Sequence, residues 1–281
     1  MHIAIAEDLR QRLPEESTTF DRLLMGEGTI HRQIKNRLTY ETWIGDRHVF
    51  VKRQLGCGWK TVLKEWSRFR QPTVSARTEW EAAERLAAAG IPVPRILGKG
   101  ERGTWPHAIE SFVILEALEN CETLEYFHEG WLGFRGAAWV ALKQELIGKV
   151  ASIARCMHQS GMNHRDFYLT HFLIARSELE NWSPGSPIHP RLIDLHRVQR
   201  RTPLPARRQI KDLGALLFSA LDSGLTSADC GRFLRVYLGS HWKEQIRARP
   251  GFWKKINRRA IRLYADFHGK SPALPAFLKA S

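Results

Sequence analysis

The sequence predicts an α+β fold with two lobes, a small antiparallel-sheet lobe with an accompanying helix, followed by a larger and mainly helical lobe. Two observations carry this prediction. Short β-rich runs separated by turn pairs fill the first part of the chain, as in consecutive hairpins. Beyond residue 119, apolar residues recur at helical spacing, which indicates amphipathic helices. We therefore expect a first lobe over residues 1–118 and a second lobe over residues 119–281.

The first lobe is expected to begin with a short helical or irregular segment over residues 1–24. Three β-rich runs follow, at residues 26–34, 39–44 and 47–52. The pairs Asn36-Arg37 and Gly45-Asp46 separate these runs, and turn pairs of this kind predict an antiparallel meander of three strands.

Two helices and two strand regions complete the first lobe. A basic amphipathic helix is predicted over residues 59–70, ended by Pro72. An Ala- and Glu-rich helix is predicted over residues 76–89, with Gly90 in the position that commonly follows a helix. Strand regions are expected at residues 92–98 and 111–118, the second of them buried.

The second lobe is predicted to consist mostly of helices. These helices are expected at residues 140–158, 212–222, 227–238 and 253–268. The last of them is strongly basic. A Ser-, Pro- and Gly-rich loop is expected at residues 181–190.

Composition narrows the class of protein. The chain has 281 residues, of which 43% are apolar, enough for a sizeable core. No run of about 20 apolar residues predicts a membrane span, and residues 1–12 carry no apolar core typical of a signal peptide. The four cysteines are scattered without a Cys-x-x-Cys pair, which favours reduced thiols and a cytoplasmic location.

The net charge is +14, from 43 Lys and Arg against 29 Asp and Glu. Such a chain should attract polyanions, which include nucleic acid, anionic lipid headgroups, a phosphorylated glycolipid and an acidic protein. The sequence contains no signature of an RNA-recognition motif, zinc finger or basic zipper, so a nucleic-acid partner is not expected.

The strongest motif lies at residues 163–173, where His164-Arg165-Asp166 matches the core of a protein-kinase catalytic loop. In that loop the aspartate accepts the proton of the attacking hydroxyl, so Asp166 is the candidate base and His164 and Arg165 belong to the candidate catalytic residues. Asp194 follows a short apolar strand, where a kinase holds its magnesium.

An upstream lysine strengthens this interpretation, because phosphoryl transfer needs cations along the phosphates. Lys52 ends an alternating strand and matches the strand lysine that contacts the α- and β-phosphates of ATP. Glu79 and Glu81 are candidates for the helix carboxylate that holds it, and we prefer Glu79. Further nucleotide contacts are expected at a glycine pair and at the end of the buried strand: Gly26, Gly28, Glu116 and Leu118.

Several positions depart from the protein-kinase pattern. His171 stands five residues after Asp166, where an Asn normally binds a second magnesium. Imidazole is a poorer magnesium ligand than an oxygen, so His171 contacts phosphate, coordinates the metal unusually, or only packs. Tyr168 stands where Ser/Thr kinases carry Lys, and Asp194-Leu195-His196 replaces Asp-Phe-Gly. These departures favour a small-molecule or glycolipid acceptor over a protein.

The segments 163–173, 193–199 and 211–216 resemble the lipopolysaccharide core heptose kinase family and its Kdo-kinase relatives, from about residue 28 to about residue 263. The resemblance implies a protein-kinase-like fold that uses ATP and Mg²⁺ to phosphorylate a heptose hydroxyl of the inner core. It places the reaction on the cytoplasmic face of a Gram-negative inner membrane. It also implies that Asp212 braces the catalytic-loop backbone, and His171 in place of Asn is characteristic of the family.

The implied acceptor carries lipid A phosphates and acidic Kdo sugars, so the basic surface is expected to bind the anionic inner membrane peripherally. The helix at residues 59–70 is the first candidate for this surface because it combines Trp with basic residues. Its basic residues are Lys60, Lys64, Arg68 and Arg70. The helix at residues 253–268 is the next candidate, and a small acidic protein is a further candidate partner.

Other classes stay open at this point. A Kdo kinase or an aminoglycoside-type small-molecule kinase would share Lys52, Asp166 and Asp194, and a pseudokinase scaffold would keep the fold without turnover. A metallohydrolase could use His and Asp residues of the same segments, but would leave the lysine strand unexplained. Its candidate ligands are His164, Asp166, His171, Asp194 and His196.

Overall fold

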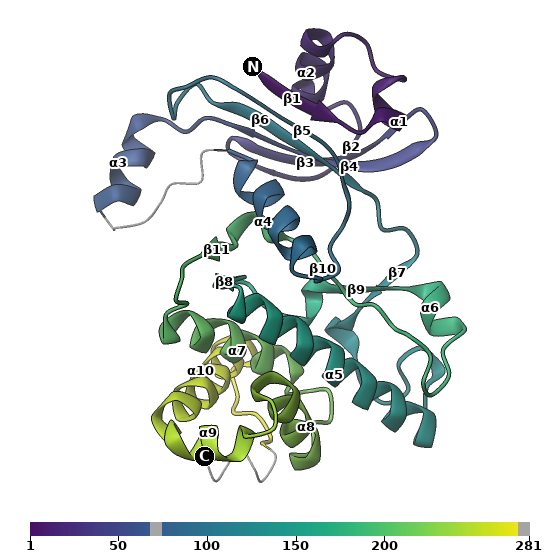
Figure 1. Ribbon diagram of the computed structural model, residues 1–281, viewed down its shortest axis with the longest axis vertical. Coiled ribbons are helices and arrows are strands. Elements are labelled where there is room, and N and C mark those ends of the chain that lie inside the picture. Colours follow the sequence, from purple (N-terminus) through teal and green to yellow (C-terminus); the bar gives the residue numbers. More distant parts are fainter. Residues whose placement is uncertain (68–74, 275–281) are drawn as a thin grey trace. The chain divides into compact units, whose positions relative to one another are not determined.

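The computed structural model describes residues 1–67 and 75–274, which form two compact units (Figure 1). The first unit comprises Met1–Arg85 and Pro94–Leu118, and the second comprises Leu86–Val93 and Glu119–Ser281. The described helices and strands make up the α+β fold predicted from the sequence.

The first unit is built on a six-stranded antiparallel sheet with the order β1-β5-β6-β4-β3-β2. The strands are β1 (His2–Ile5), β2 (Thr29–Ile34), β3 (Arg37–Ile44), β4 (Arg47–Leu55), β5 (Ile96–Arg102) and β6 (Glu110–Glu116). The predicted three-strand meander is present as β2, β3 and β4.

The expectation for residues 1–24 was wrong at its start, because the first residues form β1. This strand pairs with β5, with His2 opposite Glu101 and Ile5 opposite Gly98. Four residues carry too little periodicity to predict a strand, and the pairing partner lies far along the chain. The rest of the segment is helical or irregular as predicted, with the helices α1 (Glu7–Arg10) and α2 (Glu16–Met25).

The apolar core of the first unit lies between α1, α2 and one face of the sheet. Phe20 of α2 packs edge-to-face on Phe112 of β6, with ring centroids 5.2 Å apart. Val49 and Val51 of β4 are fully buried in this core. Since side chains alternate along a strand, Lys52 is directed to the opposite face of the sheet.

Helix α4 (Arg77–Ala88) covers that opposite face (Figure 1). There Trp80 packs with Val113 and Leu115 of β6 and with Phe50 of β4. Gly90 follows the helix with φ 78°, as its position predicted. The alternation of β4 thus places its valines against α2 and its lysine on the side of α4.

The glycine pair lies before β2 and has a structural explanation. Gly26 ends α2 in the left-handed conformation, with φ 82°. A Cβ at Gly28 would overlap the carbonyl oxygen of Glu41 on β3. Strands β2 and β3 are joined by the turn Lys35-Asn36, so the two glycines do not lie in that turn, and their contact with a nucleotide stays a prediction.

Helix α3 (Trp59–Ser67) corresponds to the start of the predicted basic helix. Trp59, Lys60 and Leu63 are exposed on it. The side chain of Lys64 and the residues Arg68, Arg70 and Pro72 lie outside the described part of the chain.

The second unit is mainly helical, as predicted. Its helices are α5 (Gly136–Gln159), α6 (Arg176–Glu180), α7 (Ala206–Ala220), α8 (Ser227–Leu238), α9 (Trp242–Ala248) and α10 (Pro250–His268). Helix α7 packs along α10, and α5 packs along α8 (Figure 1). Helix α7 begins six residues before Asp212, where the predicted helix began. The sequence did not predict these first turns, because residues 206–211 are mostly polar and show no apolar stripe.

Two small sheets fix the loops of the second unit. Strand β9 (Phe172–Ala175) lies between β7 (Cys121–Thr123) and β10 (Arg191–Leu192). Strand β8 (Met162–Asn163) pairs with β11 (Gln199–Arg200). In the described residues, no helix combines the length and apolar character that crossing a membrane requires.

Candidate active site

The first unit contains an ion pair between the strand lysine and the helix carboxylate. Lys52 Nζ lies 2.5 Å from Glu79 Oε1. Of the two carboxylates considered from the sequence, Glu79 is the buried one, whereas Glu81 pairs with Arg85 one turn further along α4. Burial of Glu79 beside a cation fixes the lysine in one place on the sheet.

The start of α4 is anchored to the sheet, which explains why Glu79 meets Lys52. The backbone N–H of Ala76 donates to Ser111 Oγ over 2.9 Å, and the Ser111 hydroxyl donates to the carbonyl of Gln54 over 3.1 Å. Strands β4 and β6 therefore hold the first turn of α4. Glu79 lies in that turn, opposite the strand that carries Lys52.

The end of β6 carries the two other predicted nucleotide contacts. Glu116 pairs with Val49 at the end of β6, while Val113 pairs with Lys52. Leu118 follows Glu116 and is half-buried, and it is the last residue of the first unit. No contact in the structure assigns either residue to a nucleotide, so both stay predictions.

In the second unit, Asp212 on α7 holds the backbone of the predicted catalytic loop. Its fully buried carboxylate accepts the N–H of His164 over 2.7 Å and the N–H of Arg165 over 2.9 Å. Arg165 has φ 76°, a left-handed conformation that disfavours non-glycine residues. Hydrogen bonds to an ionised carboxylate are strong and stabilise this turn of the loop.

His164 connects the catalytic loop to the loop that carries Asp194. Its Nε2–H donates to the carbonyl of Ile193 over 3.0 Å. Burial lowers the pKa of His164 below its ordinary value, because an imidazolium would lose its hydration. A neutral, fully buried ring is suited to joining two loops, and it lies away from solvent.

Asp166 makes an ion pair that was not predicted from the sequence. Arg197 Nη1 lies 2.7 Å from both Asp166 Oδ1 and Asp166 Oδ2. Arg197 ends the short helix η4 (Leu195–Arg197), directly after Asp194. It belongs to the segment 193–199 that carries the family resemblance, but only the fold brings this arginine to Asp166.

His171 and Asp194 face one another. The Nδ1–H of His171 donates to the backbone carbonyl of Asp166 over 2.6 Å, and its Nε2 lies 3.7 Å from Asp194 Oδ2. The other oxygen of Asp194 lies 2.6 Å from Nδ1 of His196. The backbone of Asp194 is in the left-handed conformation, with φ 60°, so the chain turns sharply at this residue.

This pair has features of a magnesium site that is completed by substrate. Mg²⁺ is commonly bound through one or two carboxylates together with phosphates and water. Asp194 provides a carboxylate, and the hydrogen bond at Nδ1 turns Nε2 of His171 toward Asp194. Among the described residues, no group of three or more His, Cys, Asp or Glu side chains forms a cation site, so these residues fit an open site and not a closed cage.

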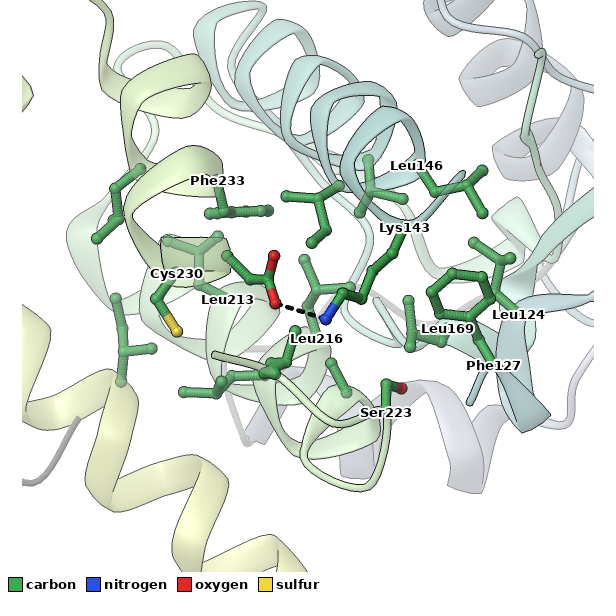
Figure 2. Close-up of a pocket in the computed structure, with 18 of the residues that line it drawn as sticks. Leu124, Phe127, Lys143, Leu146, Leu169, Leu213, Leu216, Ser223, Cys230 and Phe233 are labelled. Atoms are coloured by element: carbon green, nitrogen blue, oxygen red, sulfur yellow. Dashed lines mark ion pairs between the residues drawn. The ribbon is translucent and has the colours of Figure 1, made fainter. Parts of the chain in front are cut away.

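A separate apolar cavity of about 150 Å³ lies in the second unit (Figure 2). Side chains from α5, α7 and α8 line it, together with Leu169 of the catalytic loop. Those labelled in the figure are Leu124, Phe127, Lys143, Leu146, Leu169, Leu213, Leu216, Ser223, Cys230 and Phe233. Leu213 follows Asp212 directly, so the cavity wall and the brace of the catalytic loop share one helix.

A buried ion pair crosses the wall of this cavity. Lys143 Nζ lies 2.8 Å from Asp229 Oδ2, and the two side chains are 9% and 6% exposed. Burial raises the pKa of Asp229, but hydrogen bonds from Lys143 and Thr226 outweigh burial and leave that pKa below its ordinary value. The carboxylate therefore stays ionised within an apolar environment.

The chain order of these features is typical of the protein-kinase-like fold. A sheet unit holds a lysine against a helix glutamate, and a helical unit follows with a braced His-Arg-Asp loop and a second acidic loop. The class that fold and site define is therefore a kinase-like phosphotransferase.

Comparison with known proteins gives the family. Residues 25–237 match the model of the lipopolysaccharide kinase (Kdo/WaaP) family, and the chain belongs to this family. It is 36% identical over 262 residues to the lipopolysaccharide core heptose(I) kinase WaaP of Pseudomonas aeruginosa, which covers 92% of this chain and 95% of that protein. It is 34% identical over 212 residues to the WaaP of Escherichia coli K12, which covers 75% of this chain and 78% of that protein.

A solved structure agrees with these relatives. The structure of WaaP in complex with acyl carrier protein superposes with a TM-score of 0.76 at 32% identity, covering 94% of this chain and all of that chain. The kinase-like fold and the family resemblance predicted from the sequence are confirmed.

We expect Lys143→Met to lower the free energy of unfolding by about 3–5 kcal/mol, because Asp229 would keep an unpaired buried charge. The double variant Lys143→Met with Asp229→Leu should recover most of this loss. Urea denaturation at neutral pH measures both. Lys149→Met is the matched control, since Lys149 lies on the same helix but its side chain is 38% exposed.

The same pair predicts a pH dependence. A carboxyl with a lowered folded pKa stabilises the protein above its unfolded pKa of about 4 and loses this contribution as pH falls through the folded value. The free energy of unfolding of the wild type should therefore lose this contribution below about pH 4. Equal stability of Lys143→Met and Lys149→Met at neutral pH would contradict a buried pair.

Proposed function

We propose that this protein is an ATP-dependent kinase that phosphorylates a heptose hydroxyl in the inner core of lipopolysaccharide. The observation that carries the proposal is the 36% identity to a heptose(I) kinase over 92% of this chain. The braced loop bearing Asp166 supports it from the structure. Membership of a kinase family implies ATP as the phosphoryl donor.

In this proposal Asp166 accepts the proton of the heptose hydroxyl as its oxygen bonds to the γ-phosphorus and the bond from that phosphorus to the bridging β-phosphate oxygen breaks, which releases ADP. The hydrogen bonds that the backbone N–H groups of the two preceding residues donate to Asp212 support this role, because they fix the direction in which Asp166 leaves the loop. A base gains efficiency when it is held within hydrogen-bond reach of the proton that it accepts.

Lys52, Asp194 and His171 are assigned to the donor. Lys52, held by Glu79, would bind phosphate oxygens, and Asp194 with His171 would hold Mg²⁺. When bound, ATP would supply the phosphoryl group and Mg²⁺ would neutralise negative charge on the phosphates. Nucleotide contacts at Gly26, Gly28, Glu116 and Leu118 belong to the same proposal.

The family description includes Kdo kinases, so a Kdo hydroxyl is the second candidate acceptor. The decisive experiment incubates the protein with ATP, Mg²⁺ and dephosphorylated core lipopolysaccharide. Mass spectrometry of the core fragments then locates the new phosphate. Phosphate on a heptose supports the main proposal, phosphate on Kdo supports the second candidate, and an unmodified core refutes both.

We also propose that the first unit contacts the anionic inner face of the inner membrane. Trp59, Leu63 and Trp105 are 43%, 58% and 61% exposed, and the rings of Trp59 and Trp105 lie 6.3 Å apart. Lys60 is exposed on the same helix. Tryptophan beside basic residues is typical of a membrane-interface surface. Trp105 was not among the residues predicted for this surface.

A small acidic protein is the further proposed partner. The solved relative is a complex with acyl carrier protein. The net charge of +14 on this chain would favour association with an acidic partner of this kind.

We expect Asp166→Asn to lower transfer to core lipopolysaccharide by about 10²–10⁴-fold, because the amide keeps the shape but cannot accept the proton. ATP affinity and thermal unfolding should stay close to those of the wild type. Asp266→Asn is the control, since Asp266 is an exposed carboxylate on α10. Turnover of Asp166→Asn at the level of this control would remove Asp166 from the proposed role.

Variants of His171 distinguish a metal-ligand role of this residue from a packing role. We expect His171→Asn to keep part of the activity, because an amide oxygen is a suitable magnesium ligand, and His171→Leu to lose it. Asp194→Asn should raise the Mg²⁺ concentration needed for half-maximal rate. Activity across a Mg²⁺ titration measures all three, with His189→Leu, an exposed histidine, as control. Full activity of His171→Leu would assign His171 to packing.

Binding to anionic vesicles should weaken as salt rises, because screening shortens the reach of surface charge. The combined variant Trp59→Ser, Lys60→Gln and Trp105→Ser should bind vesicles less and show a raised KM for the lipid-linked acceptor, with the KM for ATP unchanged. Co-sedimentation measures binding, each lost cation removing about 1 kcal/mol. The control changes Lys254 and Lys255 on α10 to Gln. A larger loss in the control would assign the membrane surface to α10.

A further inference from the structure

Arg197 holds the carboxylate of Asp166 from one side. A single nitrogen, Nη1, lies 2.7 Å from both carboxylate oxygens. Rotation of the Asp166 side chain about its Cα–Cβ bond would carry the carboxylate away from this nitrogen. The guanidinium therefore holds the Asp166 side chain in one direction and leaves the lone pairs on the far side of the carboxylate available to an acceptor hydroxyl.

The segment that carries Arg197 is itself tied to the catalytic loop. Strand β11 follows η4 and pairs with β8, with Gln199 opposite Asn163. The N–H of Arg201 donates to the carbonyl of Gly161 over 2.7 Å. The backbone of residues 199–201, which follow Arg197, is thus fixed against residues 161–163, which precede His164. These bonds keep Arg197 and Asp166 in their relative position.

The catalytic loop contains no lysine of its own for this purpose. Tyr168, two residues after Asp166, stands where Ser/Thr kinases carry a cation. Burial and the negative charge of Asp166 raise the pKa of Tyr168, so its phenol is neutral at physiological pH. Lys211 on α7 is also near, and burial together with Arg165 and Arg197 lowers its pKa. Among these groups, Arg197 is the one with a direct contact to both oxygens of Asp166.

The Arg197–Asp166 ion pair is expected to contribute little to the free energy of folding. The side chains of Arg197 and Asp166 are 38% and 19% exposed, and ion pairs that are open to solvent contribute about 0–1 kcal/mol to folding. Removal of Arg197 should therefore leave the fold intact, and any large effect on turnover would come from the orientation of Asp166.

We propose that Arg197 is a positioning residue for the proposed transfer reaction, one that orients the Asp166 carboxylate toward the acceptor hydroxyl. It takes the place of the lysine that is absent at Tyr168. This inference rests on the proposed role of Asp166 as the base.

The experiment compares Arg197→Ala and Arg197→Lys with the wild type, and uses Arg200→Ala as control. Arg200 is an exposed arginine on β11, in the same segment. We expect Arg197→Ala to lower kcat by about 10²-fold, the effect of misplacing a reacting group by about 1 Å. The KM for ATP, the affinity for a non-hydrolysable ATP analogue by calorimetry and the thermal unfolding curve should match those of Arg200→Ala.

Restoring the cation should restore part of the rate. Arg197→Lys should retain more activity than Arg197→Ala, and added guanidinium ion at low millimolar concentration should raise kcat of Arg197→Ala but not of Arg200→Ala. A purely structural role would show as lowered thermal stability without rescue, and would overturn the proposal.

A double variant tests whether Arg197 acts through Asp166. In an Asp166→Asn background, measured by single turnover with excess enzyme, Arg197→Ala should cause little further loss. An undiminished loss in that background would assign Arg197 to direct contact with substrate and overturn the proposal. Activity of Arg197→Ala equal to Arg200→Ala would also overturn it. Failure of the proposed function is distinct, because the wild type itself would then leave the core unmodified.

Discussion

The site in the second unit depends on one buried carboxylate. Asp212 has no exposed surface and accepts two backbone N–H groups from consecutive residues of the catalytic loop. A buried charge is costly unless it is hydrogen-bonded, and the loop provides these bonds with Arg165 in its left-handed conformation. The bonds to Asp212 therefore stabilise a strained backbone at the residue before Asp166, and this backbone sets where Asp166 points.

The other loop contacts extend this constraint to Asp194. His164, whose backbone is held by Asp212, donates from its ring to Ile193, the residue before Asp194. His171 donates to the carbonyl of Asp166 and faces Asp194 with its second nitrogen. The loop of Asp166 and the loop of Asp194 are thus connected twice, once through the ring of His164 and once through the ring of His171. Below them, Leu169 and Leu213 line the apolar cavity, so packing in this core and the position of the site residues are coupled.

Local signals explain how much could be predicted from the sequence. Alternation in residues 47–52 predicted a strand that ends at Lys52, and Glu79 was predicted near the start of the next helix. Non-local contacts were missed. Strand β1 depends on pairing with β5, and Trp105 meets Trp59 only in the folded unit. Arg197 could not be distinguished from other arginines in a chain so rich in basic residues, since only the β8–β11 pairing carries it back to the catalytic loop.

The segment 193–199 contacts both parts of the candidate site. Its carbonyl at Ile193 accepts from His164, Asp194 lies in a left-handed turn, and Arg197 contacts the carboxylate of Asp166. In the proposed mechanism Asp194 belongs to the donor side and Asp166 to the acceptor side. One short segment, which ends in the β11 strand, therefore sets the positions of both carboxylates. A displacement of this segment would misalign the phosphoryl donor and the base together, because Asp194 and Arg197 lie three residues apart on it.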